Sequence, residues 1–466
     1  MTTTLITGGQ VVSPQGAAAA DVLIDGETVS AVLAPGTAAA LGITADRTID
    51  ATGRYVLPGG IDVHTHMDMP FGGTFSVDDF ETGTRAAAWG GTTTIVDFPV
   101  QKKGGSLQEA VDTWHAKAEG KACIDYGFHA ILADVNDTSL KEMDGLVDQG
   151  VTSFKLFMAY PGVFLSTDDQ IIQAMYRAAD NGATIMMHAE NGTAIDQIVQ
   201  RAIAAGHTAP KWHGLTRPIA LEAEAVNRAT QMADVTGAPL YFVHLSSGAA
   251  VDVVTEARDA GRNVFGETCP QYLFLDESDL ARPDFEGAKY VCTPALRPVE
   301  EQAKLWRGLR TNDLSVVATD HCPFCFVPDK QLGKDDFRAI PNGLPGVEHR
   351  MDLLHMGVTK GEISLARWVE ISSATPARMF GMYPKKGVVA PGSDADIVIY
   401  DPAAKQTVSA QTHHMNVDYS VYEGWEFTGK VETVLSRGEI VLDAGQFSGS
   451  PGRGQFIKRS LSQYLV

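Results

Sequence analysis

The chain has 466 residues, of which 44% are hydrophobic and 20% are charged. This length exceeds that of one minimal domain and fits a large domain with an accessory one. The formal net charge of −20 argues against binding to nucleic acid or to an anionic membrane surface.

The cellular setting follows from what the sequence lacks. The first residues, MTTTLITGGQVVS, show no basic segment followed by an apolar one, so secretion is not indicated. No apolar run approaches the ~18 residues of a membrane span. The five cysteines are an odd, sparse set, as expected of reduced thiols, so we expect a cytoplasmic protein. The pair Cys322 and Cys325 is compatible with redox or zinc chemistry, but no second pair matches it, which favours free thiols near a pocket.

Both ends of the chain have the alternating pattern of β-strands. Residues 1–56 alternate apolar and polar positions between glycine-rich turns, and residues 388–440 have the same texture. We expect these two pieces to form one small β-sandwich. Residues 441–466 are predicted to be a C-terminal tail that lies over a neighbouring surface, with a role in subunit contacts.

Residues 57–387 alternate between short apolar runs and amphipathic helical stretches. Eight strands are predicted, at 58–66, 92–98, 126–132, 152–158, 184–190, 239–245, 263–268 and 315–320. Nearly continuous apolar runs are typical of buried parallel strands. The fold class is therefore α/β, with a (β/α)8 TIM-type barrel beside the sandwich, and its active site is expected at the C-terminal ends of the strands.

Polar residues with metal-ligand chemistry close several of these strands. His64 and His66 end one strand, and because side chains two apart point to the same side, both imidazoles can face the barrel mouth. His188, His244 and Asp320 end three later strands. Each alone is also compatible with a core histidine or a helix cap. Together they predict a metal centre.

Lys155 in TSFKLFM is the unusual member of this set, since an ammonium cannot bind a metal. A lysine at a barrel mouth is otherwise a Schiff-base candidate or an ion-pair partner. If CO2 carboxylates the amine, however, it becomes an anionic ligand that can bridge two cations. Four imidazoles and one carboxylate otherwise provide no such bridge.

The segments DVHTHMDMPFGGT, FKLFMAYPGVF, MMHAEN, YFVHLSS, TDHCPF and NGLPGVEHR resemble, in this order, the motifs of the cyclic amidohydrolases. Within them the chain is most similar to the dihydropyrimidinase/D-hydantoinase family, over essentially its whole length. The resemblance implies a hydrolase that opens the ring amide of hydantoins or 5,6-dihydropyrimidines to N-carbamoyl amino acids.

The resemblance also implies a role for each matched position. Two divalent metals, zinc in most members and manganese or cobalt in some, would be bound by His64, His66, carboxylated Lys155, His188, His244 and Asp320. A hydroxide bridging the metals would be the nucleophile, with Asp320 as proton shuttle. Tyr160 would donate a hydrogen bond to the oxyanion, although it is also compatible with a packing role.

Substrate contacts follow by the same matching. Thr293 and Asn342 would hold the ring amide, and Phe71, Phe157 and Phe164 would line the pocket for the exocyclic group, unless they are ordinary core aromatics. Thr293-Pro294-Ala295 departs from the Ser-Pro-Pro more common in the family, which leaves the pocket rim in doubt. The partners expected are a small cyclic ureide and further copies of the chain in a homotetramer.

Two other classes fit less well. Dihydroorotase needs a cation two residues after the second histidine, where this chain has Asp68, and Tyr160 in KLFMAYPG argues against allantoinase. Non-catalytic scaffold relatives have lost metal ligands, whereas all six positions are filled here. The natural substrate, the stereochemical preference, the native metal and the choice between tetramer and dimer stay open, although MPFGG favours the D-hydantoinase side.

Overall fold

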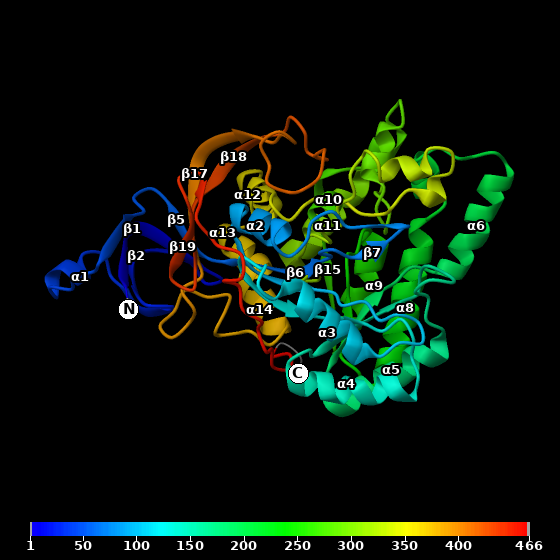
Figure 1. Ribbon diagram of the computed structural model, residues 1–466, viewed down its shortest axis with the longest axis horizontal. Coiled ribbons are helices and arrows are strands. Elements are labelled where there is room, and N and C mark those ends of the chain that lie inside the picture. Colours follow the sequence, from blue (N-terminus) through cyan, green and yellow to red (C-terminus); the bar gives the residue numbers. More distant parts are fainter. Residues whose placement is uncertain (1, 464–466) are drawn as a thin grey trace.

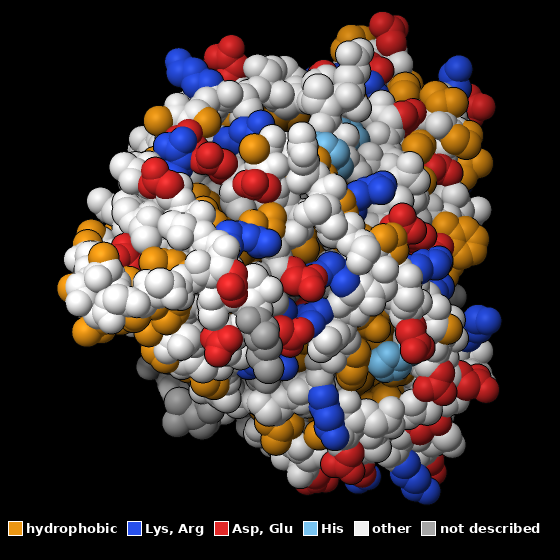
Figure 2. Space-filling model, turned by 60° about the vertical axis from the view of Figure 1, so that its left-hand side comes forward, with side chains coloured by type: hydrophobic (Ala, Val, Ile, Leu, Met, Phe, Trp, Pro, Cys, Tyr) orange, Lys and Arg blue, Asp and Glu red, His pale blue; other side chains and the backbone are white. Residues whose placement is uncertain are grey.

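The computed structural model describes residues 2–463 and consists of a parallel barrel with a β-sheet layer at its side (Figure 1). In Figure 1 the sheet lies at the left, where the first and last parts of the chain meet, and the barrel with its helices lies at the right. On the face seen in Figure 2, acidic and basic side chains are interspersed and form no continuous basic area. Within residues 2–463, no helix has both the length and the apolar character needed to cross a membrane.

The barrel contains the eight predicted strands. They are β6 (Gly60–Thr65), β9 (Thr92–Asp97), β10 (Asp125–Phe128) with β11 (Ala130–Ile131), β12 (Ser153–Phe157), β13 (Thr184–His188), β14 (Leu240–Phe242), β15 (Val264–Thr268) and β16 (Val316–Val317). All neighbouring pairs are parallel. A parallel bridge between Thr65 and His321 joins the last strand to the first and closes the barrel.

The third strand is divided at His129, which differs from the continuous strand predicted over 126–132. The His129 amide still donates to Asp97 O at 2.8 Å, but its ring lies between Ser153 Oγ at 2.5 Å and Val63 O at 3.1 Å. The ring therefore links the third strand to β12 beside it and to β6, two strands away, inside the barrel.

Helices follow the strands and form the outer ring of the barrel (Figure 1). They include α2 (Thr82–Trp89), α3 (Leu107–Ala118), α4 (Asp137–Gln149), α5 (Asp168–Asn181), α6 (Gly192–Ala204), α7 (Lys211–Leu215), α8 (Ile219–Thr236), α9 (Gly248–Asp259), α10 (Pro270–Phe274), α11 (Glu300–Thr311), α12 (Arg350–Thr359), α13 (Leu365–Val369) and α14 (Thr375–Met379). Gly182 and Gly237 end α5 and α8 in the left-handed conformation, which glycine adopts without steric cost.

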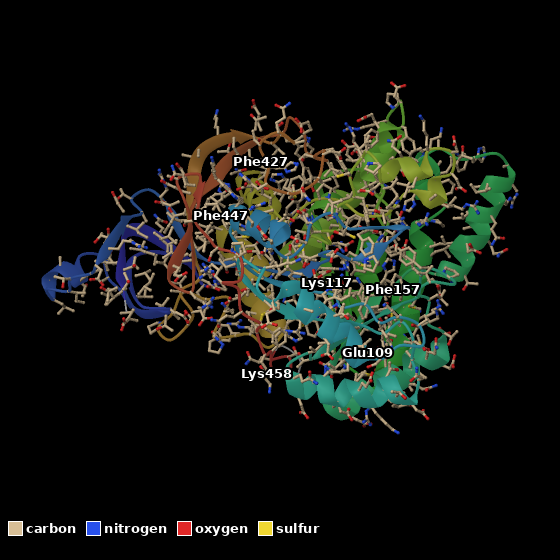
Figure 3. The ribbon with its side chains drawn as sticks, in the orientation of Figure 1. Glu109, Lys117, Phe157, Phe427, Phe447 and Lys458 are labelled. Carbon is tan, nitrogen blue, oxygen red and sulfur yellow. The ribbon has the colours of Figure 1, made fainter. Side chains whose placement is uncertain are left out.

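One nine-stranded sheet joins the two ends of the chain, as predicted. Its N-terminal strands are β1 (Thr3–Ser13), β2 (Gly16–Asp25), β3 (Thr28–Leu33), β4 (Arg47–Asp50) and β5 (Tyr55–Pro58). Its C-terminal strands are β17 (Ile397–Thr407), β18 (Glu426–Ser436), β19 (Glu439–Asp443) and β20 (Gln446–Phe447). The β5–β17 pair is the seam between them, and Phe427 and Phe447 mark the C-terminal half in Figure 3.

The tail after β20 lies against the base of the barrel. Ile457 donates its amide to Tyr126 O at 2.7 Å, and Arg459 is buried with its guanidinium bound to Phe128 O and to Ser153 Oγ. Asp125, at the start of β10, accepts from Lys386 at 2.6 Å and from Arg437 at 3.1 Å. Barrel, sheet and tail therefore share one buried polar junction.

Candidate metal centre and substrate pocket

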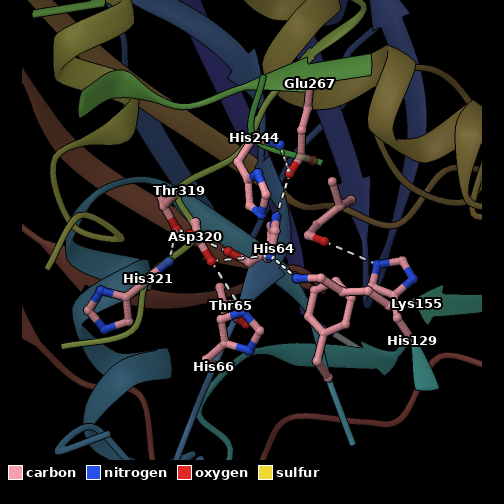
Figure 4. Close-up of polar contacts among 12 residues, drawn as sticks. His64, Thr65, His66, His129, Lys155, His244, Glu267, Thr319, Asp320 and His321 are labelled. Atoms are coloured by element: carbon pink, nitrogen blue, oxygen red, sulfur yellow. Dashed lines mark hydrogen bonds and ion pairs between the residues drawn. The ribbon is translucent and has the colours of Figure 1, made fainter. Parts of the chain in front are cut away.

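The strand ends bring the predicted ligands together at the barrel mouth. His64 lies in β6, Lys155 in β12 and His188 at the end of β13, and His244 is the second residue after β14. All four side chains are almost fully buried. Figure 4 shows His64 at the middle of the group, with His66, Lys155, His244 and Asp320 around it.

Short distances connect four of these side chains, those of His64, His66, Lys155 and Asp320. His64 Nε2 lies 2.9 Å from Lys155 Nζ and 3.2 Å from Asp320 Oδ1, and His66 Nε2 lies 3.2 Å from the same oxygen. The His188 and His244 ring centroids are 4.5 Å apart. His64, His244 and Asp320 each have one possible ligand atom, and these three atoms lie within 4.8 Å of one another.

This donor set fits divalent metal ions. His66 Nδ1 and His244 Nδ1 are buried without a hydrogen-bond partner, a costly arrangement for isolated imidazoles that must retain one proton. Burial also lowers the pKa of His64 and His244 well below the usual value, so both rings are neutral, as metal ligands must be.

Lys155 lies among these rings, with Nζ 2.9 Å from His64 Nε2. Burial lowers the pKa of its amine to about 8, and Nζ lies over the rings of Phe98 and Phe157 at 4.4 and 5.0 Å from the centroids. About a tenth of this amine is therefore uncharged at pH 7, and the uncharged amine is the form that reacts with CO2.

Two carboxylates that the sequence analysis did not single out orient the histidines. Glu267, in β15, places Oε1 2.5 Å from His64 Nδ1, and Tyr241 donates to its other oxygen at 2.8 Å. Glu190 places Oε2 2.9 Å from His188 Nε2. A hydrogen bond on one ring nitrogen fixes the tautomer and leaves the other nitrogen to face the site, so Nε2 of His64 and Nδ1 of His188 carry the lone pairs that a metal ion can bind.

Backbone conformation at the strand ends is unusual. Tyr160, His244 and Asp320 have φ values of 61°, 42° and 52°, in the left-handed region that non-glycine residues rarely adopt. Such residues cost roughly 1–3 kcal/mol each and cluster at functional sites. The turns end the strands and direct these side chains into the mouth.

The residues predicted to contact the substrate line a narrow pocket above the proposed metal ligands. Its walls include Tyr160, Thr293, Asn342 and Cys322, and its rim is aromatic. Phe71 stacks parallel to Phe164 with centroids 6.3 Å apart, and Phe157 lies 5.0 Å from Phe164. Phe157 is labelled inside the barrel part in Figure 3. Burial raises the pKa of Tyr160 far above that of a free tyrosine, so its hydroxyl stays a hydrogen-bond donor.

A larger cavity of about 740 Å³ continues outward from this pocket, sharing Phe71, Tyr160, Phe164, Thr293 and Asn342 with it. Cys322 and Cys325 are both free thiols, and burial raises the pKa of each, so neither is poised as a thiolate.

Comparisons with known proteins agree with this geometry. The amidohydrolase family model matches residues 55–441. The D-hydantoinase of Streptomyces coelicolor is 63% identical over 463 residues, covering 99% of both chains, and that of Geobacillus stearothermophilus is 48% identical over 98% of this chain and 97% of its own. The crystal structure of the dihydropyrimidinase from Brevibacillus agri has a TM-score of 0.97 at 50% identity, with 99% of each chain covered. This chain belongs to the D-hydantoinase/dihydropyrimidinase family of the amidohydrolases.

Proposed function

We propose that this protein is a metal-dependent cyclic amidohydrolase that opens the ring amide of 5-substituted hydantoins and 5,6-dihydropyrimidines to N-carbamoyl amino acids. The observation that carries the proposal is the convergence at the mouth of the barrel, where His64 Nε2 lies 2.9 Å from Lys155 Nζ and 3.2 Å from Asp320 Oδ1. The full-length identity to D-hydantoinases supports the substrate class and a preference for the D-isomer.

The proposed ligands are His64 and His66 for a buried ion, His188 and His244 for a more exposed one, carboxylated Lys155 between them, and Asp320 on the first. Two zinc ions suit this imidazole-rich set, and manganese or cobalt are the alternatives. When bound, the ions would supply Lewis-acid chemistry, acidifying a water molecule and polarising the carbonyl.

The chain's own residues would carry the proton transfers. Asp320 lies against both His64 and His66, where it can accept a proton from the attacking water and return it to the departing ring nitrogen. The Tyr160 hydroxyl would donate to the carbonyl oxygen as it becomes negative, a contribution of ~3–4 kcal/mol in comparable sites.

Substrate placement would fall to the pocket walls. Thr293 and Asn342 would bind the ring amide at the narrow end. Phe71, Phe157 and Phe164 would contact the exocyclic group, which extends into the outer cavity. If the contacts to Thr293 use the main chain, the threonine side chain replaces the family's serine without loss.

Assembly and location complete the proposal. A homotetramer, with residues 441–466 contributing to subunit contacts, is the assembly that the family resemblance implies, and light scattering measures it directly. The five free cysteines support a reducing compartment such as the cytoplasm.

Hydrolysis of dihydrouracil and of D- and L-5-substituted hydantoins, by protein as purified, stripped with a chelator and reloaded with zinc, tests the activity. We expect metal-dependent ring opening, fastest for a D-hydantoin. Turnover of allantoin instead would contradict the proposed substrate, and failure to bind metal would indicate a non-catalytic scaffold.

A further inference from the structure

Lys330 is a fully buried lysine beneath the substrate pocket. It begins the short helix η3 (Lys330–Gly333). Its ammonium donates three hydrogen bonds, to Val291 O at 3.1 Å, Pro341 O at 2.7 Å and Gly343 O at 2.9 Å. An ammonium has three N–H donors, so its capacity is completely used by main-chain carbonyls.

The three carbonyls belong to the two segments that carry the proposed amide contacts. Val291 lies two residues before Thr293, and Pro341 and Gly343 flank Asn342 on both sides. These segments follow two separate short helices, η2 (Glu286–Tyr290) and η4 (Phe337–Ala339), and belong to no common strand. A Gly343 N to Val291 O hydrogen bond of 3.0 Å and the Lys330 ammonium join them.

The charge of Lys330 has no carboxylate opposite it. Its Nζ contacts main-chain carbonyls instead, and burial lowers its pKa to about 7. An apolar side chain would fill this space without the desolvation penalty of a cation. Three carbonyls can each receive a hydrogen bond only from the protonated amine, so the presence of a lysine here points to these directed hydrogen bonds rather than to volume.

We propose that Lys330 is a positioning residue that fixes the spacing between Thr293 and Asn342 and so orients the ring amide toward the metal centre. This inference rests on the proposed function. Lys330 touches neither the substrate pocket nor a proposed metal ligand, so it acts through the two loops and not on the reacting atoms.

The test compares Lys330→Met and Lys330→Arg with Lys334→Met, a control on an exposed lysine four residues along the same segment. For Lys330→Met we expect kcat/KM for a 5-substituted hydantoin to fall ~10²-fold, through a lower kcat as well as a higher KM, since misplacement of the ring amide by about 1 Å has this effect. Lys330→Arg keeps the charge, but its planar fork cannot serve three converging carbonyls, so we expect a smaller loss. Metal content should equal that of the native protein in all three.

A double-mutant cycle separates positioning from general stability. Where Asn342 is already replaced by alanine, Lys330→Arg should raise KM much less than in the native background, because the two residues act through one contact. A purely structural role predicts additive losses, and additivity would overturn the inference, as would kcat/KM within about twofold of native in folded Lys330→Met. Absence of turnover in the native protein would instead overturn the proposed function.

Discussion

Replacing Glu190 by glutamine should weaken the binding of one metal ion and leave the other unchanged. Glu190 Oε2 lies 2.9 Å from His188 Nε2, in a site where the side chain is 1% exposed. Glutamine keeps the shape and an acceptor oxygen but removes the charge. Hydrogen bonds to charged groups contribute ~1.5–3 kcal/mol, against ~0.5–1.5 kcal/mol for neutral ones. The difference of ~1–1.5 kcal/mol corresponds to binding of the outer ion that is about five to thirteen times weaker.

Glu190→Ala removes the contact completely, and we expect a loss toward the upper end of the 10–100-fold range typical of such orienting partners. The assay is competition with a chromophoric chelator, which resolves the release of the two ions. Asp196→Asn is the matched control, because Asp196 lines the same outer cavity but accepts only from Gln200 in the structure. Release of both ions at native rates, or equal acceleration of both, would refute the orienting role.

Three further outcomes are expected. Lys155→Ala should lose most metal and activity and regain part of both with added short carboxylates, and full activity without them would eliminate the carbamate bridge. Asp320→Ala should lose turnover far more than thermal stability, measured by kcat beside the unfolding midpoint, so near-native kcat would remove Asp320 as the proton shuttle. In stripped protein the neutral fraction of Lys155 rises from ~10% at pH 7 to ~90% at pH 9, because its pKa is about 8. Reactivation by metal at a constant concentration of dissolved CO2 should therefore accelerate across this interval and level off above it, and a rate independent of pH would contradict a neutral-amine reaction.

The sequence predicted the barrel and its mouth well because apolar runs mark buried strands and polar residues at their ends stand out. His64, His188, His244 and Asp320 each close such a run, and the structure brings all four to one place. The joining of the two chain ends was also predicted, since both share the alternating pattern, but the structure alone shows that β5 and β17 are the strands that pair.

Contacts between side chains that lie far apart in the sequence could not be predicted in this way. Glu267 lies in a strand that the sequence identified, but its contact with His64 spans 203 residues, and one sequence does not reveal which buried carboxylate faces which ring. Lys330 lies in the polar stretch VPDKQLGKDD, which has the composition of an exposed loop. Only the tertiary structure shows that its side chain passes beneath the pocket.

The placement of Arg459 bears on how the nascent chain matures. Phe128 O and Ser153 Oγ receive their guanidinium donor from 331 and 306 residues farther along. At ~5–20 residues per second, the ribosome needs about 15–60 s to add the later stretch. During that interval the emerging barrel has an open floor, with apolar side chains that Ile457 later covers. Completion of the floor therefore waits until Arg459 has left the ribosome, and molecular chaperones that shield apolar surfaces can act during this interval.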